Sequence, residues 1–396
     1  MRKRFDLKKN TLIYCSLAFI GGISWCSSVC FAQFNMGMFI KKKKVTAPTI
    51  TSLSGGLFQT CAINTAGTLK CWGQNSNGQV GDGTTVQKNS PTAVTTGGPY
   101  SRVSAGGNHT CGITTAGQLR CWGYNQLGQL GDGSTTQKTT PTLIDGAVTY
   151  SRVSAGGTHT CGITTTGDLK CWGSNINGQI GDATYTQRNS PKLIATGYSE
   201  VSAGNGFTCG ITTSGVLKCW GSNSSGELGD GTTTLRNVPT NVNDAATYAK
   251  IACAPGAPHA CGITTAGVLK CWGDNTYGAV GDGTTTQRNS PVPIDSPTLY
   301  SGVAKGGGHG CAVTTAGVLK CWGDNGTGQI GDGTTTTTLS PKPISLGANV
   351  TLTGTSVQAS CGVTTSGVLK CWGDNSMGQV GDGSTAQRTS PVPITF

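Results

Sequence analysis

Charged and aromatic residues are scarce in this chain of 396 residues. Asp, Glu, Lys and Arg together make up 11%, aromatic residues make up 6%, and there are only four histidines. No nucleophile, acid and base recur with catalytic spacing, and paired carboxylates are absent from the neighbourhood of any one repeated unit. The sequence therefore predicts no enzyme active site and no cofactor.

Glycine and cysteine, in contrast, are abundant and regularly placed. The chain has 63 glycines and 18 cysteines. Fourteen cysteines form seven pairs, and successive pairs start 48 to 52 residues apart. A fixed period near 50 residues indicates a repeat architecture. The pairs are Cys61 with Cys71, Cys111 with Cys121, Cys161 with Cys171, Cys209 with Cys219, Cys261 with Cys271, Cys311 with Cys321, and Cys361 with Cys371.

Each unit begins with the pattern of a β-hairpin. In the fifth copy, a β-branched run leads to a turn at Ala266 and Gly267, and the residues after it alternate across a second strand. If the turn is centred on Ala266, Cys261 faces Cys271 on one side and Trp272 points to the other. Each hairpin is then expected to carry its own disulfide.

Four strand candidates recur in every unit. In the second copy they are Tyr100–Ala105, His109–Thr114, Gln118–Trp122 and a short strand around Pro141–Ile144. Seven units of four strands predict an all-β fold, a seven-bladed β-propeller of about 50-residue repeats. An open β-solenoid is the alternative, but it needs atypical capping repeats, and the first and last copies look like the middle ones.

The unit resembles the regulator of chromosome condensation repeat. The shared pattern is H-T-C-G-I-T-T-x-G-x-L-K-C-W-G-x-N-x-x-G-Q-[LIV]-G-D-G, followed by a proline-led strand, and it covers residues 50–394. The resemblance implies a seven-bladed propeller. Nuclear members normally lack the paired cysteines and a secretory leader, so the chain looks like an exported, bacterial-type member. Some members carry a wedge that acts on a small GTPase. No insertion here is long enough, so nucleotide exchange is not expected.

The chain before the repeats divides into a leader and a linker. Basic residues at 2–9, an apolar run at 12–25 and a small residue at Ala32 predict a signal peptide over residues 1–32, cleaved before Gln33. An uncleaved signal anchor and a lipoprotein are the alternatives. The protein is therefore expected in the periplasm, on the cell surface or outside the cell.

Residues 33–49 form a short linker with four adjacent lysines, and the propeller follows at residues 50–396, with repeats starting near 50, 100, 150, 198, 248, 300 and 350. Residues 1–44 hold nine basic side chains and one acidic side chain, which accounts for most of the net charge of +11. The lysines are expected to serve as a solvated spacer or to touch anionic lipid or polymer. Membrane contact is expected only through the leader or this linker.

Export favours disulfides over metal binding for the paired cysteines. The metal alternative uses His-x-Cys, because His109, His159, His259 and His309 stand two residues before a cysteine. Two cysteines and one histidine leave tetrahedral zinc one ligand short, so no metal is expected. The family resemblance implies a packing and hydrogen-bonding role for these histidines near the inner strands. Cys253 has no partner in its unit and is predicted to be a free buried thiol, with intermolecular pairing as the alternative.

Charged residues also recur once per unit. Each ring is expected to pair with charges of neighbouring blades or to cap turns, with a polyanion or calcium site as the alternative. The glycine-aspartate-glycine loops lack the alternating acidic ligands of a calcium loop. Aromatic residues do not interleave with the basic ones, so no nucleic acid partner is expected. The rings are Lys70, Arg120, Lys170, Lys218, Lys270, Lys320 and Lys370; Asp82, Asp132, Asp182, Asp230, Asp282, Asp332 and Asp382; and Lys88, Lys138, Arg188, Arg236, Arg288 and Arg388, with Thr338 in the sixth copy.

Partner recognition is expected where the copies differ on a fixed frame. The two variable positions of the N-x-x-G loop change from copy to copy, and the candidate binding residues there or beside it are Tyr124, Leu127, Ile176, Tyr277 and Met377. Packing against an adjacent blade is the alternative role for them. Phe58 and Phe207 are candidates for the mouth of the central channel.

The sequence thus favours an exported, non-catalytic binding or adhesion module for a protein or carbohydrate partner, acting as a monomer. A structural component of the cell envelope and a secreted inhibitor of an enzyme are the alternatives. Fold resemblance alone does not supply the ligand.

Overall fold

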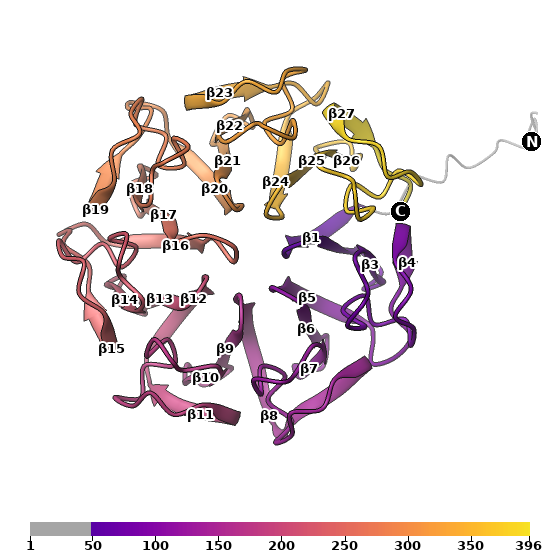
Figure 1. Ribbon diagram of the computed structural model, residues 1–396, viewed down its shortest axis with the longest axis vertical. Helices are drawn as coiled ribbons and strands as arrows, with labels where there is room; N and C mark the ends of the chain where they lie inside the picture. Colours follow the sequence, from indigo (N-terminus) through magenta and orange to yellow (C-terminus); the bar gives the residue numbers. More distant parts are fainter. Residues whose placement is uncertain (1–48) are drawn as a thin grey trace, which may run out of the picture. The chain divides into compact units, whose positions relative to one another are not determined.

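A computed structural model describes residues 49–396, which form a ring of seven antiparallel blades around a central channel (Figure 1). The predicted signal peptide at 1–32 and all but the last residue of the predicted linker at 33–49 lie outside the described residues. The prediction of an all-β, seven-bladed propeller is confirmed.

Within residues 49–396, no helix is long and apolar enough to cross a membrane.

The strands are numbered along the chain, and each blade is built from the channel outwards. The first three blades contain β1 (Ile50–Gly55), β2 (Gln59–Asn64), β3 (Leu69–Gly73) and β4 (Lys88–Ala93); β5 (Tyr100–Ala105), β6 (His109–Thr114), β7 (Gln118–Gly123) and the start of β8 (Lys138–Ala155); the end of β8, β9 (His159–Thr164), β10 (Leu169–Gly173) and β11 (Arg188–Ala195). The other four contain β12 (Tyr198–Ala203), β13 (Phe207–Thr212), β14 (Leu217–Gly221) and β15 (Arg236–Asn241); β16 (Tyr248–Cys253), β17 (His259–Thr264), β18 (Leu269–Gly273) and β19 (Arg288–Pro293); β20 (Tyr300–Lys305), β21 (His309–Thr314), β22 (Leu319–Gly323) and β23 (Thr338–Ile344); β24 (Val350–Thr355), β25 (Ala359–Thr364), β26 (Leu369–Gly373) and β27 (Arg388–Pro393).

Blades 2 and 3 are joined by one continuous strand. β8 pairs with β7 as the outer strand of blade 2 and then with β9 as the inner strand of blade 3. The outer strand of blade 2 is longer than the predicted segment at Pro141–Ile144, because Lys138 already pairs with Gly123 across a shift in register.

The hairpin register agrees with the predicted one. Cys261 lies opposite Cys271 and Ile263 lies opposite Leu269, so the turn is centred on Ala266. Because the two cysteines face each other across adjacent strands, a disulfide between them closes a short loop within its own blade.

All seven predicted cysteine pairs form disulfides within their blades, with Cα–Cα distances of 4.0 to 4.1 Å. No described cysteine is linked to a cysteine of another blade. The disulfides join Cys61 with Cys71, Cys111 with Cys121, Cys161 with Cys171, Cys209 with Cys219, Cys261 with Cys271, Cys311 with Cys321, and Cys361 with Cys371.

The hydrophobic core consists of layers between neighbouring blades. In the layer between blades 5 and 6, Cys261, Ile263 and Leu269 of blade 5 pack with Trp322 of blade 6, which is fully buried. The disulfide face of each hairpin therefore meets the next blade, and its tryptophan face meets the preceding blade. The opposite orientation of cysteine and tryptophan predicted from strand alternation is confirmed.

The ring closes through the same contacts that join the other blades. Trp72 Nε1 and Thr60 Oγ1 of blade 1 donate to the carbonyl of Gln379 in blade 7, at 3.0 and 2.9 Å. Trp72 also packs with Val363 and Leu369 of that blade. The closed ring excludes the open solenoid, and every blade except the pair that shares β8 is built from its own consecutive strands.

Candidate functional site: the loop face

One face of the ring carries both the turns between first and second strands and the long loops after third strands. The two segments are hydrogen-bonded at the edge of each blade: Gln74 N donates to Phe58 O, and Asp274 N donates to Pro258 O, both at 2.9 Å. We call this the loop face. The turns between second and third strands, such as residues 65–68, lie at the other ends of these strands, on the hairpin face.

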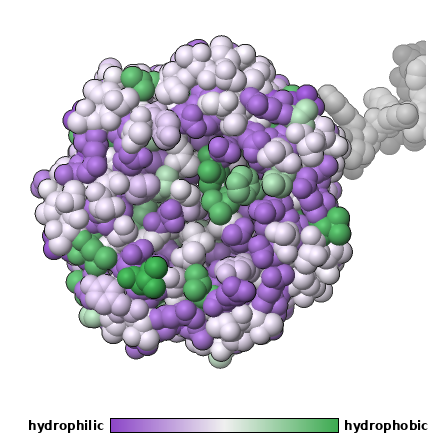
Figure 2. All heavy atoms as spheres, in the orientation of Figure 1, coloured by the Kyte–Doolittle hydropathy of each residue, from purple (hydrophilic) through white to green (hydrophobic). Residues whose placement is uncertain are grey.

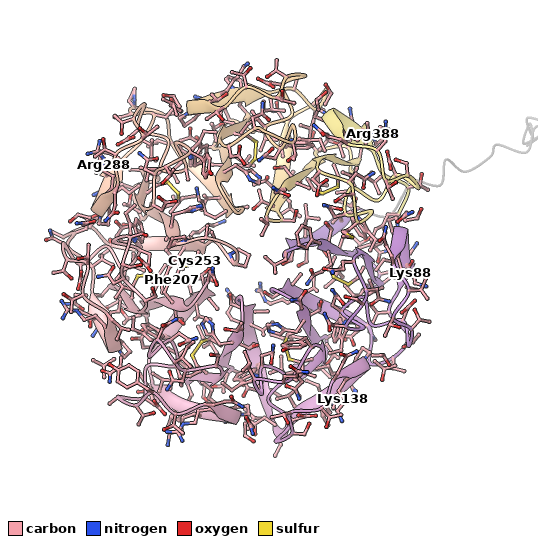
Figure 3. The ribbon with its side chains drawn as sticks, viewed as in Figure 1. Lys88, Lys138, Phe207, Cys253, Arg288 and Arg388 are labelled. Carbon is pink, nitrogen blue, oxygen red and sulfur yellow. A yellow bond between two sulfur atoms is a disulfide. The ribbon has the colours of Figure 1, made fainter. Side chains whose placement is uncertain are left out.

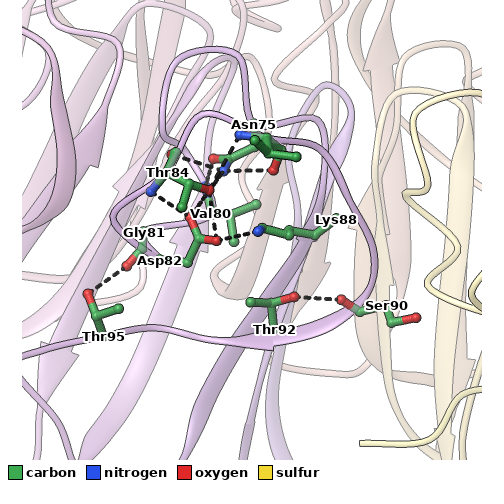
Figure 4. A network of polar contacts seen from close by, with 10 residues as sticks. Asn75, Val80, Gly81, Asp82, Thr84, Lys88, Ser90, Thr92 and Thr95 are labelled. Atoms are coloured by element: carbon green, nitrogen blue, oxygen red, sulfur yellow. Dashed lines mark hydrogen bonds and ion pairs between the residues drawn. The ribbon is translucent and has the colours of Figure 1, made fainter.

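The long loops are held by a buried asparagine (Figure 4). Asn75 Nδ2 donates to Asp82 Oδ1 at 3.2 Å and to the carbonyl of Val86 at 3.1 Å, and its Oδ1 accepts from Val80 N at 2.9 Å. Each of these bonds has a counterpart in all seven blades. The equivalent asparagines are Asn125, Asn175, Asn223, Asn275, Asn325 and Asn375.

The same loop also holds the next blade in place. The carbonyl of Gln79 accepts from Trp122 Nε1 at 3.0 Å and from Thr110 Oγ1 at 2.8 Å. Gly81 has a φ of 82°, and a β-carbon there would lie 2.5 Å from Trp122 Nε1. Only glycine fits this position, because both its backbone angle and the tryptophan exclude a side chain. The repeated residues of the motif thus serve the fold.

The aspartate ring caps turns and forms ion pairs inside its own blade. Asp82 Oδ1 accepts from Thr84 N at 3.0 Å, and its Oδ2 lies 2.7 Å from Lys88 Nζ. Turn capping is confirmed, whereas pairing with neighbouring blades is wrong for this ring, because the loop folds back onto its own outer strand. The pairs are Asp82–Lys88, Asp132–Lys138, Asp182–Arg188, Asp230–Arg236, Asp282–Arg288, Asp332–Lys342 and Asp382–Arg388.

Two details of the charge pattern were not apparent from the sequence. Lys342 supplies the cation of the sixth blade, where the usual position is Thr338. Three lysines of the first basic ring pair with aspartates in the segments that lead into their blades, as Lys170 does with Asp145 at 2.7 Å, Lys270 with Asp244 and Lys320 with Asp295. Figure 3 shows Lys88, Lys138, Arg288 and Arg388 at the outer part of the ring.

These aspartates predict a loss of stability in acid. Burial alone raises the pKa of Asp332, but hydrogen bonds from Lys342 and Thr334 outweigh it and lower the pKa to about 2, from 3.8. A carboxyl with a lowered folded-state pKa stabilises the fold above pH 4 and loses that contribution as the pH falls towards 2. We expect urea midpoints to fall between pH 5 and pH 2.5, and to fall less in Asp332→Asn. An equal fall in both proteins would contradict this assignment.

The first variable position of the N-x-x-G loop is exposed in all seven blades. Ile176 is 76% exposed there. The second position is partly covered in six blades, including Leu127 and Met377, and only Tyr277 is exposed, at 56%. Tyr124, just before the second copy's asparagine, is half-buried and donates to Gln126 Oε1 at 2.6 Å. The candidate binding residues therefore differ widely in exposure.

The second variable position leans on the turn of the next blade. Thr327 Oγ1 lies 3.4 Å from the carbonyl of Gln358, and Tyr277 Cδ2 would lie 3.6 Å from a β-carbon on Gly308. Contact with the adjacent blade, the alternative role for these residues, thus applies to the second position. The first position projects beyond it.

The turn of blade 5 crosses the centre of the loop face. Its residues 254–258, which we call the channel plug, include two more than the equivalent turns. A β-carbon on Gly256 would collide with Val357 of blade 7 and lie 3.4 Å from Leu57 of blade 1, and the carbonyl of Pro255 lies next to Gly157 of blade 3. In Figure 2 no opening passes through the centre of the ring, and hydrophobic residues form separate groups, one of them at the centre.

The channel plug also interrupts a series of bonds around the channel. Elsewhere the turns are joined by backbone hydrogen bonds, such as Gly107 N to Gly156 O at 2.9 Å. Among residues 49–396 no backbone bond of this kind joins the channel plug to the turns beside it. Its neighbour His259 instead bonds the carbonyl of Gly307 through Nε2, at 3.1 Å.

The four histidines are fully buried between blades. His109 Nε2 bonds Thr160 Oγ1 of the next blade at 2.8 Å, and burial lowers the pKa of this histidine to about 3, so the ring is neutral. The cysteine two residues after each histidine is bonded in a disulfide, which leaves no thiolate for a metal. Hydrogen bonding near the inner strands, as the family resemblance implies, agrees with these contacts.

Phe207 is not at the channel mouth. It is fully buried between blades 4 and 5, where it packs with Ala260 and Cys253 (Figure 3). In other blades a histidine bonds a threonine of the next blade, as His109 does with Thr160. Here Phe207 stands at the histidine position and Ala260 at the threonine position, so an apolar contact replaces the hydrogen bond. Phe58, by contrast, is partly exposed in its turn. Cys253 is a free, buried thiol at the end of β16, and the prediction is confirmed.

Comparison with known proteins supports this architecture. The RCC1-like domain matches residues 32–366, and the regulator of chromosome condensation (RCC1) repeat matches residues 356–379. No curated protein sequence matches the chain significantly.

Solved structures share the fold at low sequence identity. Human WBSCR16 is 19% identical with a TM-score of 0.73, over 82% of this chain and 94% of that one. Yeast RCC1 (Prp20), solved with Kap60 bound, is 17% identical with a TM-score of 0.73, over 90% and 86%. The CRINKLY WD40 ectodomain of the Arabidopsis thaliana receptor kinase ACR4 is 20% identical with a TM-score of 0.53, over 88% and 99%. The chain belongs to the family of the RCC1-like domain.

Proposed function

We propose that the protein is an exported, non-catalytic binding module that holds a protein or carbohydrate partner on its loop face. The observation that carries the proposal is that the repeated and the variable residues of each long loop have different environments. Asn75, Gln79 and Asp82 and their equivalents bond within the protein, while the first variable position projects into solvent in every blade. A rigid frame with varied exposed side chains is how repeat proteins gain specificity without losing their fold.

The exposed apolar residues favour partner binding over a purely structural role. Ile176 and Tyr277 lie on two such loops, at 76% and 56% exposure. Aromatic and large apolar side chains on rigid supports are the usual anchors of protein interfaces, and an aromatic ring also suits a sugar face. Yeast RCC1 (Prp20) was solved with Kap60 bound, and a study of Prp20p describes its binding to Gsp1p and histones, so a protein of similar fold has protein partners.

Two observations support export. The seven disulfides are typical of oxidising compartments. The Arabidopsis propeller of similar fold is a receptor ectodomain. The basic residues of the outer strands are already paired with aspartates, as Arg288 is with Asp282 at 2.6 Å, so they do not form an open surface for nucleic acid.

The test replaces the five candidate residues together by serine, and the substitutions are Tyr124→Ser, Leu127→Ser, Ile176→Ser, Tyr277→Ser and Met377→Ser. We expect pull-downs from intact cells and periplasmic extract to lose the partner of the wild-type propeller. Exposed substitutions cost about 0.5 kcal/mol or less each. The substitutions of Ile176 and Tyr277 should therefore change the melting temperature little. The substitutions of the three half-buried residues should lower it somewhat more.

The chain offers a matched control on the other face. Val216, Val318 and Val368 are 38 to 41% exposed in hairpin turns. Changing these three valines to serine should leave partner capture intact. Protease or glycosidase treatment of the extract identifies the partner as protein or glycan. Undiminished capture by the loop-face variant, or loss of capture by the hairpin-face control, would place the site elsewhere.

A further inference from the structure

A cavity of about 190 Å³ lies in the channel, and Pro255 of the channel plug forms part of its wall. The rest of the wall comes from the ends of the inner strands of all seven blades. None of the lining residues is Asp or Glu. A ligand in this cavity would therefore meet hydroxyls, backbone amides and one lysine, Lys305, and no negative charge.

Four serine hydroxyls line one side of the cavity as potential donors. In blades 1 to 4, the serine Oγ accepts a hydrogen bond from the backbone amide at the strand end of the next blade, as Ser104 does from Ala155 N at 2.9 Å. Accepting that bond leaves the hydroxyl proton free. Within residues 49–396 the hydroxyl protons of Ser54, Ser104 and Ser154 have no hydrogen-bond acceptor, whereas Ser202 also lies within hydrogen-bonding reach of the Cys253 thiol. The serines are Ser54, Ser104, Ser154 and Ser202.

The other side of the cavity lacks these serines and has an unpartnered threonine hydroxyl. Ala252, Ala304 and Gly354 stand at the serine position in blades 5 to 7, so the amides of the next strand ends lack a serine hydroxyl to bond. Thr355 lines the cavity, is 5% exposed, and its Oγ1 has no hydrogen-bond partner in the described chain. A buried polar group of this kind normally has a partner in the functional state.

Lys305 brings a positive charge beside this wall, and its Nζ lies in the layer between blades 5 and 6, 5.3 Å from the centre of the Trp322 ring. Its position holds alanine in blades 2 to 4, and the side chain is 4% exposed. Nζ donates to the carbonyl of Ala279 at 2.7 Å and lies beside Gly310. Blades 1 to 4 have threonine at the position of Gly310 and blade 7 has serine, and the hydroxyl of these residues makes the equivalent bond. The ammonium thus replaces a missing hydroxyl, but it has no carboxylate partner within residues 49–396.

We infer that the channel cavity binds an oxyanion, either a small free anion or the carboxylate at the end of a partner's chain. Hydroxyl and amide donors that converge on a cavity, with a buried cation beside its wall and no carboxylate in the wall, form an environment that favours a negatively charged oxygen. The inference is independent of the proposed partner site, which lies on the exposed loops.

The burial of Lys305 affects its titration. Burial lowers its pKa to about 7, from 10.5. The charged groups packed around it give no compensation, because His259 and His309 are buried with lowered pKa values and are neutral. A bound anion would favour the ammonium form and raise this pKa.

Isothermal titration calorimetry of the full propeller with acetate, sulfate and phosphate tests the inference, and acetamide is the neutral control. We expect one anion per chain and no binding of acetamide. Short peptides with free or amidated C-termini separate the two sources: binding of the free acid alone assigns the site to a chain end, and binding of the small ions assigns it to free anions. Either result supports the oxyanion site.

Two variants make the assignment specific. Thr355→Val removes one donor without changing side-chain volume, and Lys305→Ala with Gly310→Thr restores the residues of blade 2 while removing the charge. Each should weaken anion binding at least about fivefold, a typical effect of losing one bond to a charged group. Lys192→Met removes an exposed charge and should have no effect. Absence of binding by all anions, or equal weakening by Lys192→Met, would overturn the inference.

Discussion

Replacing Trp72 with alanine is expected to lower the free energy of unfolding by about 3 to 5 kcal/mol, the range for a fully buried tryptophan. Trp72 is 0% exposed and packs against blade 7, where its Nε1 donates to the carbonyl of Gln379. The substitution leaves a cavity in the layer that closes the ring and removes one of the two donors to that carbonyl.

Trp172→Ala is the matched comparison, because Trp172 makes the same contacts with blade 2 in the interior of the ring. Chemical denaturation should give the two variants similar losses. A loss near zero for Trp72→Ala with a large loss for Trp172→Ala would mean that blade 1 has an exposed face and that the ring is open.

Removing the Cys111–Cys121 disulfide by alanine substitution at both positions is expected to cost about 3 kcal/mol, from the chain entropy of a loop of about 11 residues. Both cysteines are 0% exposed. Dithiothreitol without denaturant should therefore leave the native disulfides intact, and thiol titration should detect them only after unfolding.

Cys253→Ala is the control for this measurement. Cys253 is the free thiol of the described chain, and alanine stands at its position in blades 2 to 4. Its substitution should cost about 1 kcal/mol or less, as for small core changes. A cost as small as this for the double substitution would show that the disulfide contributes little to stability.

The features predictable from sequence are those set by local spacing and by the repeat. The facing of Cys261 and Cys271 depends only on strand alternation about a short turn, and the structure has that register. The period of about 50 residues also implied identical layers between blades. Ring closure follows from it, because the first copy carries the tryptophan and the last copy the glutamine that also join blades 2 and 3.

The charge pairs were harder to predict from the sequence, because the conformation of a long loop decides which residues meet. Asp332 pairs with Lys342 ten positions away, although the equivalent aspartates pair with a residue six positions away. Sequence comparison of the copies had found the absence of a basic residue at Thr338, but it gave no reason to choose Lys342.

The channel was not predictable, because its features combine residues from different blades. The extra length of the blade 5 turn was visible in the sequence, but two additional residues do not show that the turn reaches Leu57 and Val357 across the ring. Likewise, Lys305 and Gly310 each differ from the residues at their positions in blades 2 to 4. Only their closeness reveals that one compensates for the other.

Exposure of the candidate binding residues depends on the position within the loop. The first variable position points away from the ring and the second rests on the next blade, so Ile176 and Leu127 occupy different environments although they stand one position apart in equivalent loops. Among the five candidates, we therefore expect Ile176 and Tyr277 to contribute most to partner binding.

Site-specific photo-crosslinking tests the central claim most directly, because it reports which face touches the partner in the native protein. A photoreactive phenylalanine analogue is placed at Ile176 on the loop face or at Val318 on the hairpin face, both of which are exposed. Irradiation on intact cells should give a crosslinked product from position 176 and none from position 318. A product from position 318 alone would contradict the assignment of binding to the loop face.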